Sequence, residues 1–291
     1  LKKLNIKVTG IGLLFKSIFM KKFNIQNAKL RCKEYRLKIL EISQKVQALH
    51  LGGAYSCMEI VDMIYFYFMR KKNYKYLDTF LMSKGHSCMA QYVILEKLKI
   101  LKKKDIDEYC TSKGILGCHP DYGNPGIEAS TGSLGHGLGL AVGMVQADRI
   151  NNINRKTFVL ISDGELQEGS TWENMMMAAN LELENLIVFL DHNGSQSFGQ
   201  TKITHPQFYP IKEKVLSFNW DCLEILDGHN QKEILNKTSS IFKRRKKPIL
   251  VICNTIKGKG VSYMENEPIW HYRSPTKDEY KIAKMELNKS A

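Results

Sequence analysis

The sequence predicts an α/β fold in which a parallel β-sheet is flanked by helices. Residues 158–161 and 186–190 are short apolar runs rich in β-branched residues, which is typical of parallel strands buried on both faces. Apolar residues recur at helical spacing between these runs, so this segment is a strand-helix-strand unit. Residues 222–226 and 248–253 are expected to be further strands, separated by a helix near 231–246.

The part of the chain before residue 158 is expected to be mainly helical. Expected helices cover residues 28–49, 56–69, 83–101 and 135–150, and the last of these is rich in Gly and Ala, which suits close packing. The strand at 158–161 is therefore the first that the sequence predicts.

The helix between the two central strands carries its own start signal. Ser170 and Glu173 have the Ser-x-x-Glu spacing of a capping box, which predicts a helix beginning there. Apolar side chains follow at helical spacing; they are Trp172, Met175, Met176, Ala179 and Leu183.

Length and charge favour one domain with a basic extension. The chain has 291 residues, enough for one large α/β domain, and we divide it into a basic N-terminal extension (1–27) and a single domain (28–291). The formal charge is +14, but residues 1–38 hold eleven Lys/Arg and one Glu, or 11 − 1 = +10. No nucleic-acid recognition motif accompanies this charge, so we expect a basic tail rather than a nucleic-acid partner.

Cysteine usage and hydropathy predict a cytoplasmic protein. The seven cysteines are odd in number and contain no C-x-x-C pair, which favours reduced thiols over disulfides or a zinc site. The apolar stretch at 11–20 is short and broken by Lys16, so no membrane partner is expected.

Polar residues follow both central strands and suit a magnesium site. Asp163 follows the first strand and Asn193 the second, and the carboxyl ends of parallel strands lie at one edge of a sheet. Mg²⁺ prefers hard oxygen ligands shared with phosphates, so we expect Asp163, Asn193 and the carbonyl of Ser195 to bind it. Gly164 would let a phosphate approach the backbone. The alternative is a pair of ordinary turns, since Asp-Gly and Asn-Gly are common turn dipeptides.

Four histidines lie in loops that also contain Gly, Pro or an aromatic residue. These are His50, His86, His119 and His271. Polar side chains on glycine-rich loops fit a binding cleft, although each alone could be a surface or hydrogen-bonded core residue. Two further Gly-rich stretches, 132–139 and 257–260, match neither the dinucleotide nor the Walker spacing, so no nucleotide site is expected.

The order of these motifs resembles the transketolase family. The segment 162–169 followed by Asp191-His192-Asn193 resembles the family's thiamine diphosphate motif, with Ser162 in place of the first glycine. Before it come a Gly-His loop at His50, the segment 78–86 resembling D-R-x-x-x-S-K-G-H, then G-H-P and T-G-S-L-G. After it comes a His, His271, that follows K-G-K-G. The resemblance runs from about residue 30 to 285. Departures from the family pattern are Thr79 for Arg, Tyr272 for Gly, His136 for Gln, and Leu49 and Leu51 beside His50.

The resemblance implies a thiamine diphosphate-binding fold and a set of site residues. The cofactors implied are thiamine diphosphate and Mg²⁺, or Ca²⁺ or Mn²⁺ in its place. The metal ligands would be Asp163, Asn193 and Ser195. Cofactor contacts would come from His50, His86, Gly132, Ser133, Leu134, Asp163, Gly164, Glu165, Asn193 and His271. The catalytic set would be His50, His119 and His271, which would face the sugar, and Glu168 at a subunit interface.

The resemblance also implies a partner subunit. The family's second domain supplies a glutamate that contacts the cofactor's pyrimidine ring, so we expect the N-terminal subunit of a split transketolase, in an α2β2 assembly with a pyrimidine-binding chain. Such an enzyme transfers a two-carbon ketol unit from a ketose to an aldose. Two alternatives stay open: another thiamine diphosphate enzyme, such as a deoxyxylulose phosphate synthase or a sugar-biosynthesis ketolase, and a non-catalytic α/β partner-binding module.

Overall fold

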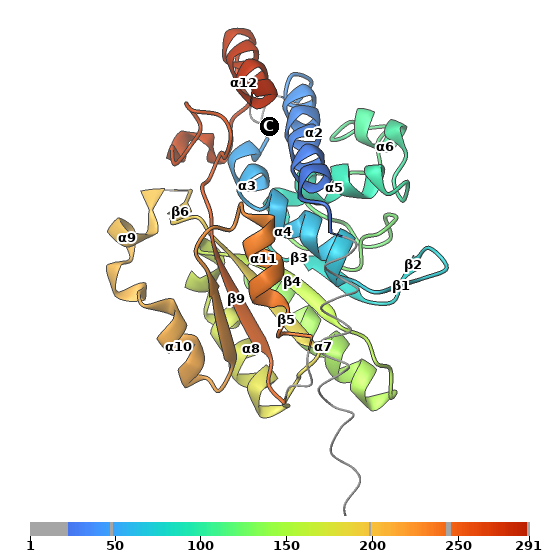
Figure 1. Ribbon diagram of the computed structural model, residues 1–291, viewed down its shortest axis with the longest axis vertical. Coiled ribbons are helices and arrows are strands. Elements are labelled where there is room, and N and C mark those ends of the chain that lie inside the picture. Colours follow the sequence, from blue (N-terminus) through green and yellow to red (C-terminus); the bar gives the residue numbers. More distant parts are fainter. Residues whose placement is uncertain (1–22, 47–48, 198, 243–245, 290–291) are drawn as a thin grey trace, which may run out of the picture.

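A five-stranded parallel sheet forms the centre of the protein, in the order β3-β4-β5-β9-β8 (Figure 1). This computed structural model describes residues 23–46, 49–197, 199–242 and 246–289. The strands are β3 (Thr79–Met82), β4 (Thr157–Ser162), β5 (Leu186–His192), β8 (Asp221–Ile225) and β9 (Ile249–Asn254). Each neighbouring pair is parallel, which confirms the predicted α/β fold.

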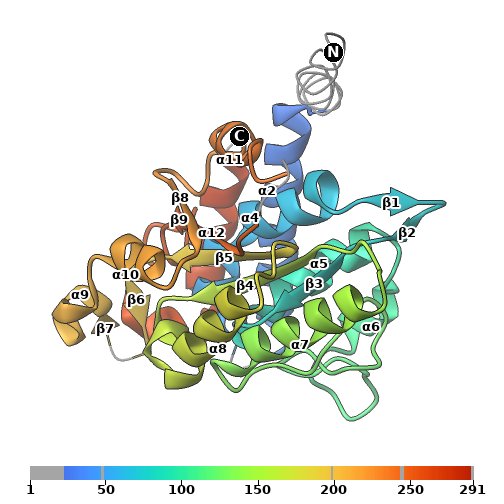
Figure 2. The ribbon, with the colours of Figure 1, turned by 90° about the horizontal axis from the view of Figure 1, so that it is seen from below.

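Helices cover both faces of this sheet. The helices are α2 (Ile25–Ile42), α3 (Leu51–Ser56), α4 (Met58–Met63), α5 (Cys88–Lys97), α6 (Lys103–Asp107), α7 (His136–Ile150), α8 (Gly169–Asn180), α9 (Thr201–Thr204), α10 (Ile211–Ser217), α11 (Gln231–Thr238) and α12 (Lys277–Lys289). Figure 2 shows α7 and α8 on one side of the sheet and α4 and α11 on the other. Short turns and ribbons complete the chain; they are η1 (Ile64–Phe68), η2 (Gly85–Ser87), η3 (Gly164–Gln167), η4 (Pro206–Phe208), η5 (Pro268–His271), β1 (Lys71–Lys72), β2 (Lys75–Tyr76), β6 (Ser195–Gln196) and β7 (Gly199–Gln200).

The central strands supply side chains to two separate apolar cores. Phe158 and Leu160 of β4 belong to the core under α2, α4 and α11. Val159 and Ile161 belong to the core under α7, α8 and α10. Successive side chains of a strand point to opposite faces, so a strand covered on both sides must be apolar throughout. This explains the uninterrupted apolar runs from which the sheet was predicted.

The prediction from the sequence missed one strand of the central sheet and overextended several helices. Residues 79–82 form β3, so the first strand of the sheet comes before residue 158. The expected helix at 83–101 is shorter, because Gly85–Ser87 is a 3-10 turn and α5 begins only at Cys88. The expected helix at 28–49 corresponds to α2, which ends at Ile42. The one at 231–246 corresponds to α11, which ends at Thr238.

The predicted capping box was wrong. Helix α8 has Glu168 as its N-cap, so Ser170 lies inside the first turn instead of in front of it. The side chain of Met176, which the helical spacing grouped with the core, is 46% exposed.

The predicted basic extension, 1–27, lies mostly outside the described residues, and α2 begins at Ile25. Within the described part of the chain, no helix has both the length and the apolar character needed to cross a bilayer.

Candidate functional site

The polar residues singled out in the sequence gather where the parallel strands end. Strands β3, β4, β5 and β9 are neighbours in the sheet, so the segments that follow them meet at one edge. Loops from elsewhere in the chain complete this region. Helix α3 contacts both η2 and η5 there, and Figure 1 shows α3 beside the red segment that precedes α12.

The turns after β4 and β5 are hydrogen-bonded to each other. Oδ1 of Asp163 accepts from the backbone N–H of Asn193 at 3.2 Å, and Oδ2 accepts from that of Gly194 at 2.5 Å. The Asn193 amide donates through Nδ2 to Asp191 at 3.2 Å, which fixes Oδ1 on the other side of the group. That oxygen accepts from the backbone N–H of Ser195 at 3.0 Å. The Asp163 carboxylate therefore lies against the turn that carries Asn193, at the ends of two neighbouring strands.

A buried ion pair supports this edge of the sheet. Nζ of Lys84 donates to Oδ2 of Asp191, and the two side chains are 1% and 0% exposed. Hydroxyl groups of Ser56 and Thr255 also donate to this carboxylate, each at 2.5 Å. Burial opposes both charges, but the pair holds the pKa of Lys84 above and that of Asp191 below its ordinary value. Both groups therefore stay ionised at neutral pH.

The four loop histidines form one cluster. The ring centre of His50 lies 5.3 Å from that of His86, 6.2 Å from that of His119 and 5.3 Å from that of His271. The rings of His86 and His271 are 5.4 Å apart. Tyr272 adds an aromatic side, with its ring 4.6 Å from that of His50.

Lys257 reaches the same cluster from the segment after β9. Its Nζ lies 3.0 Å from Nδ1 of His271, and the residue is 2% exposed. Burial, together with the charge of Lys84, lowers the pKa of Lys257 to about 8. Burial and nearby positive charge also lower the pKa of His50 to about 4 and that of His271 to about 3. The imidazoles are thus neutral at pH 7, in a region whose cations favour an anionic ligand.

A glycine turn lies against this cluster. The backbone of Gly132 has a φ of +136°, and a Cβ atom there would lie 2.7 Å from the ring of His119. The hydroxyl of Thr131 donates to the carbonyl of Met82 at 2.7 Å, which holds the turn at the end of β3. The buried carboxylate of Glu165 accepts from the backbone N–H of Gly135 at 3.0 Å. Burial raises the pKa of Glu165 to about 7.

Comparison with known families identifies this arrangement. The family described as "Transketolase, thiamine diphosphate binding domain" matches residues 28–289. The chain belongs to the transketolase family. The fold is therefore the thiamine diphosphate-binding fold that the motif order implied.

Several transketolase subunits are similar to the chain over nearly their whole length. One of them, a subunit of the apulose-4-phosphate transketolase of Phocaeicola vulgatus, is 37% identical over 268 residues, covering 91% of this chain and 95% of that protein. The 6-deoxy-6-sulfo-D-fructose transketolase subunit SqwG of a Clostridium species is 33% identical, covering 86% and 92%.

Solved transketolase structures contain the same fold as part of a longer chain. The structure from Campylobacter jejuni superposes with a TM-score of 0.83 at 25% identity. It covers 91% of this chain, whereas the chain spans 43% of the length of that transketolase.

The residues at this edge fit magnesium and a diphosphate. A carboxylate, an amide oxygen and nearby backbone carbonyls are the hard oxygen donors that Mg²⁺ takes alongside phosphate oxygens. A Cβ atom at Gly164 would contact only Cβ of Gln196, at 3.7 Å, so the backbone of the turn is open to a ligand. Lys84 and Lys257 provide positive potential that favours a diphosphate, and the neutral rings of His86 and His271 can donate hydrogen bonds to it.

The structure brings together most of the residues selected from the sequence. The four histidines, Gly132, Asp163, Gly164, Asn193 and Ser195 all lie in this region. Ser133 and Glu168 are exposed, Leu134 is half-buried, and Glu165 is buried against the backbone of Gly135. These roles stay predictions.

Sequence reasoning missed Lys84, Lys257 and the carboxylate of Asp191. Lys84 lies inside the S-K-G-H motif, and Asp191 begins the Asp-His-Asn segment, but only the neighbouring residues were selected. Lys257 begins K-G-K-G, which helped to place His271 in the family's motif order, but the lysine itself was not selected. The position of each lysine within a family motif was the signal that could have found it.

Proposed function

We propose that this chain is the diphosphate-binding subunit of a two-chain transketolase that moves a two-carbon ketol unit from a ketose to an aldose. The observation that carries the proposal is the meeting of the Asp163–Asn193 turn pair with four histidines and Lys257 at one edge of the sheet. The near end-to-end similarity to relatives named as transketolase subunits supports the two-chain form.

Asp163, Asn193 and the carbonyl of Ser195 would hold Mg²⁺, or Ca²⁺ or Mn²⁺. The diphosphate would be held by His86, Gly164, His271 and Lys257. The two histidines are neutral and can donate hydrogen bonds, the backbone at Gly164 is open to a ligand, and Lys257 is a cation. When bound, thiamine diphosphate supplies the carbon nucleophile for breaking and forming the C–C bond.

The remaining histidines suit the sugar. His50 and His119 are half-buried and neighbour each other, and an imidazole ring can donate to hydroxyl groups or accept from them. They would orient the sugar and carry protons to and from its oxygen atoms. Gly132, Ser133 and Leu134 would lie along the aminopyrimidine, with Glu165 holding their turn. Substrates would be sugars or sugar phosphates, in keeping with the names of the relatives.

Glu168 would face the partner subunit, because it is an exposed acidic residue at the start of α8 beside the cofactor turn. The partner would be a pyrimidine-binding chain that supplies a glutamate for the cofactor ring, in an α2β2 assembly. We place the enzyme in the cytoplasm, since all seven cysteines are free thiols.

The test is reconstitution. The full chain would be mixed with thiamine diphosphate, Mg²⁺ and a chain from the same genome that resembles the second half of transketolase. Ketol transfer would be followed by mass spectrometry with a panel of ketoses and aldoses. We expect transfer only when both chains are present. Turnover by this chain alone would contradict the two-chain proposal, and no cofactor binding by the mixture would contradict the site.

A further inference from the structure

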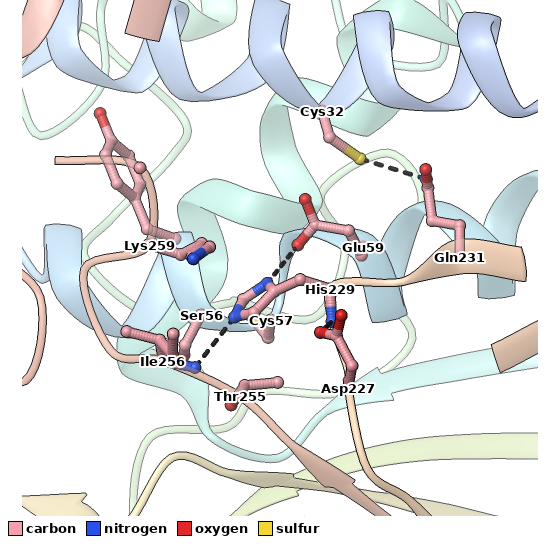
Figure 3. Close-up of polar contacts among 12 residues, drawn as sticks. Cys32, Ser56, Cys57, Glu59, Asp227, His229, Gln231, Thr255, Ile256 and Lys259 are labelled. Carbon is pink, nitrogen blue, oxygen red and sulfur yellow. Dashed lines mark hydrogen bonds and ion pairs between the residues drawn. The ribbon is translucent and has the colours of Figure 1, made fainter. Parts of the chain in front are cut away.

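His229 lies in the turn before α11 and links two distant parts of the chain. Its Nδ1 lies 2.8 Å from Oε2 of Glu59 in α4, and its Nε2 accepts a 2.9 Å hydrogen bond from the backbone N–H of Ile256. Figure 3 shows the imidazole ring between these two groups. The side chain of His229 is only 10% exposed, so water competes little for either contact.

The two contacts fix the protonation of the ring. A backbone N–H only donates, so Nε2 of His229 must be unprotonated and Nδ1 must carry the hydrogen that Glu59 accepts. Burial opposes the charge of Glu59, but Arg36 and the hydrogen bond from His229 lower its pKa to about 2. Arg36 donates to both carboxylate oxygens, at 2.6 and 2.7 Å. The imidazole of His229 thus hydrogen-bonds to a carboxylate that is itself fixed in the buried Arg36–Glu59 ion pair.

The backbone that His229 holds enters the candidate site at the next residue. Ile256 precedes Lys257, whose Nζ lies 3.0 Å from Nδ1 of His271. The rest of this segment is anchored by 3.0 Å hydrogen bonds from the backbone N–H groups of Thr255 to His192 and of Gly258 to Gly52. The contact with His229 lies between these two anchors, directly beside the residue that carries the amine.

We propose that His229 is a positioning residue, which fixes the backbone of Ile256 and thereby aims the amine of Lys257 into the cofactor site. The inference rests on the proposed function only in assigning Lys257 to the diphosphate. A histidine suits this role because one rigid ring carries a donor on one side and an acceptor on the other. It can therefore join the Glu59 carboxylate to a backbone N–H.

The test uses the full chain and a pair of amide substitutions at this position. His229→Asn keeps a donor near the position of Nδ1 for Glu59 but has no acceptor that reaches Ile256. His229→Gln places an acceptor near the position of Nε2 and should restore the contact. The matched control is Gln231→Leu. Gln231 is a neighbouring buried amide that donates to Asp62 at 3.1 Å and to Cys32 at 3.4 Å, and it does not contact the segment 255–258.

The first readout is the reaction of the Lys257 amine with limiting acetic anhydride between pH 7 and 11, followed by mass spectrometry. In the unsubstituted chain this amine should titrate near pH 8, because burial and the charge of Lys84 lower its pKa more than the carboxylates of Asp163 and Asp191 raise it. The other titratable group that it faces is His271. His229→Asn should move the midpoint toward the ordinary value of 10.5, while His229→Gln and Gln231→Leu should leave it near 8. The second readout is affinity for magnesium pyrophosphate, which should fall about tenfold in His229→Asn and recover in His229→Gln.

Three results would overturn the inference: an unchanged Lys257 midpoint in His229→Asn, an equal shift in Gln231→Leu, or no recovery in His229→Gln. Should His229→Asn fail to fold, hydrogen exchange of the unsubstituted chain decides, since rapid exchange of the Ile256 amide would contradict the contact. The labelling requires no cofactor. Failure of the unsubstituted chain to bind pyrophosphate would therefore count against the proposed function and would leave the judgement on His229 to the labelling.

Discussion

Nζ of Lys257 lies 3.0 Å from Nδ1 of His271, and the pKa of each group is lowered by burial and by neighbouring positive charge. At pH 7 the lysine carries the proton and the histidine is neutral. The pair therefore presents one cation whose charge is lost within an accessible pH range.

This relationship predicts a pH-dependent affinity for magnesium pyrophosphate. The charged form of Lys257 attracts the anion. The pKa of Lys257 in the protein without ligand is about 8, so the affinity should fall as the pH rises above 8. One linked proton limits the fall to about tenfold per pH unit. Titration calorimetry at pH 7, 8 and 9 measures it. Lys257→Met should bind more weakly at pH 7. At each pH the affinity of the unsubstituted chain is divided by that of Lys257→Met, which cancels the titration of pyrophosphate itself. A ratio that does not change with pH would contradict the assignment.

The second prediction concerns the metal. Asp163→Ala should abolish Mg²⁺-dependent binding of thiamine diphosphate in the assembled enzyme, because it removes the carboxylate next to Asn193. Loss of a group that only orients a ligand costs about 10–100-fold, so loss of the ligand itself should exceed that. Binding would be compared with Mg²⁺ and with EDTA. Glu173→Ala, which removes an exposed carboxylate from α8, is the control and should bind normally. Unchanged affinity in Asp163→Ala would exclude this residue as a metal ligand.

The sequence predicted the centre of the sheet well because burial on both faces leaves an uninterrupted apolar run, as in β4 and β5. It missed β3, where four residues lie between polar neighbours and carry too little pattern to distinguish a strand. The capping box failed because Ser-x-x-Glu marks a helix start only when the turn before it agrees, and here Glu168 takes the N-cap position.

The candidate site could likewise be predicted from the sequence only in part. The loops of the four histidines could be selected because a Gly, Pro or aromatic residue lies close to each histidine in the sequence. The Lys84–Asp191 pair could not be derived from composition, since the burial of two charges depends on helices and strands far apart in sequence. The contact of His229 with Ile256 likewise joins a turn to a backbone N–H, which no residue type reveals.

The third prediction concerns the buried ion pair between Lys84 and Asp191. Lys84→Met should lower the free energy of unfolding by about 3–5 kcal/mol, because it leaves the Asp191 carboxylate buried without its counter-ion. Lys97→Met is the matched control. It breaks the ion pair with Glu34, whose side chains are 48% and 45% exposed, and it should cost roughly 0–1 kcal/mol. Urea denaturation followed by circular dichroism measures both. Equal losses in the two variants would mean that the Lys84–Asp191 pair contributes no more than a surface pair.

The last prediction compares two glycines. Gly132→Ala should destabilise the protein by about 1–3 kcal/mol, since the backbone there has a φ of +136° and the new Cβ would lie 2.7 Å from the His119 ring. Gly143 lies in α7, and a Cβ atom there would meet nothing within 4 Å, so Gly143→Ala should stabilise by about 0.5–1 kcal/mol. Urea denaturation gives both values. Because the ring of His119 must move to admit the Cβ atom, Gly132→Ala should also weaken thiamine diphosphate binding in the assembled enzyme, whereas Gly143→Ala should not. Normal cofactor binding in a destabilised Gly132→Ala protein would show that this turn serves the fold and not the cofactor.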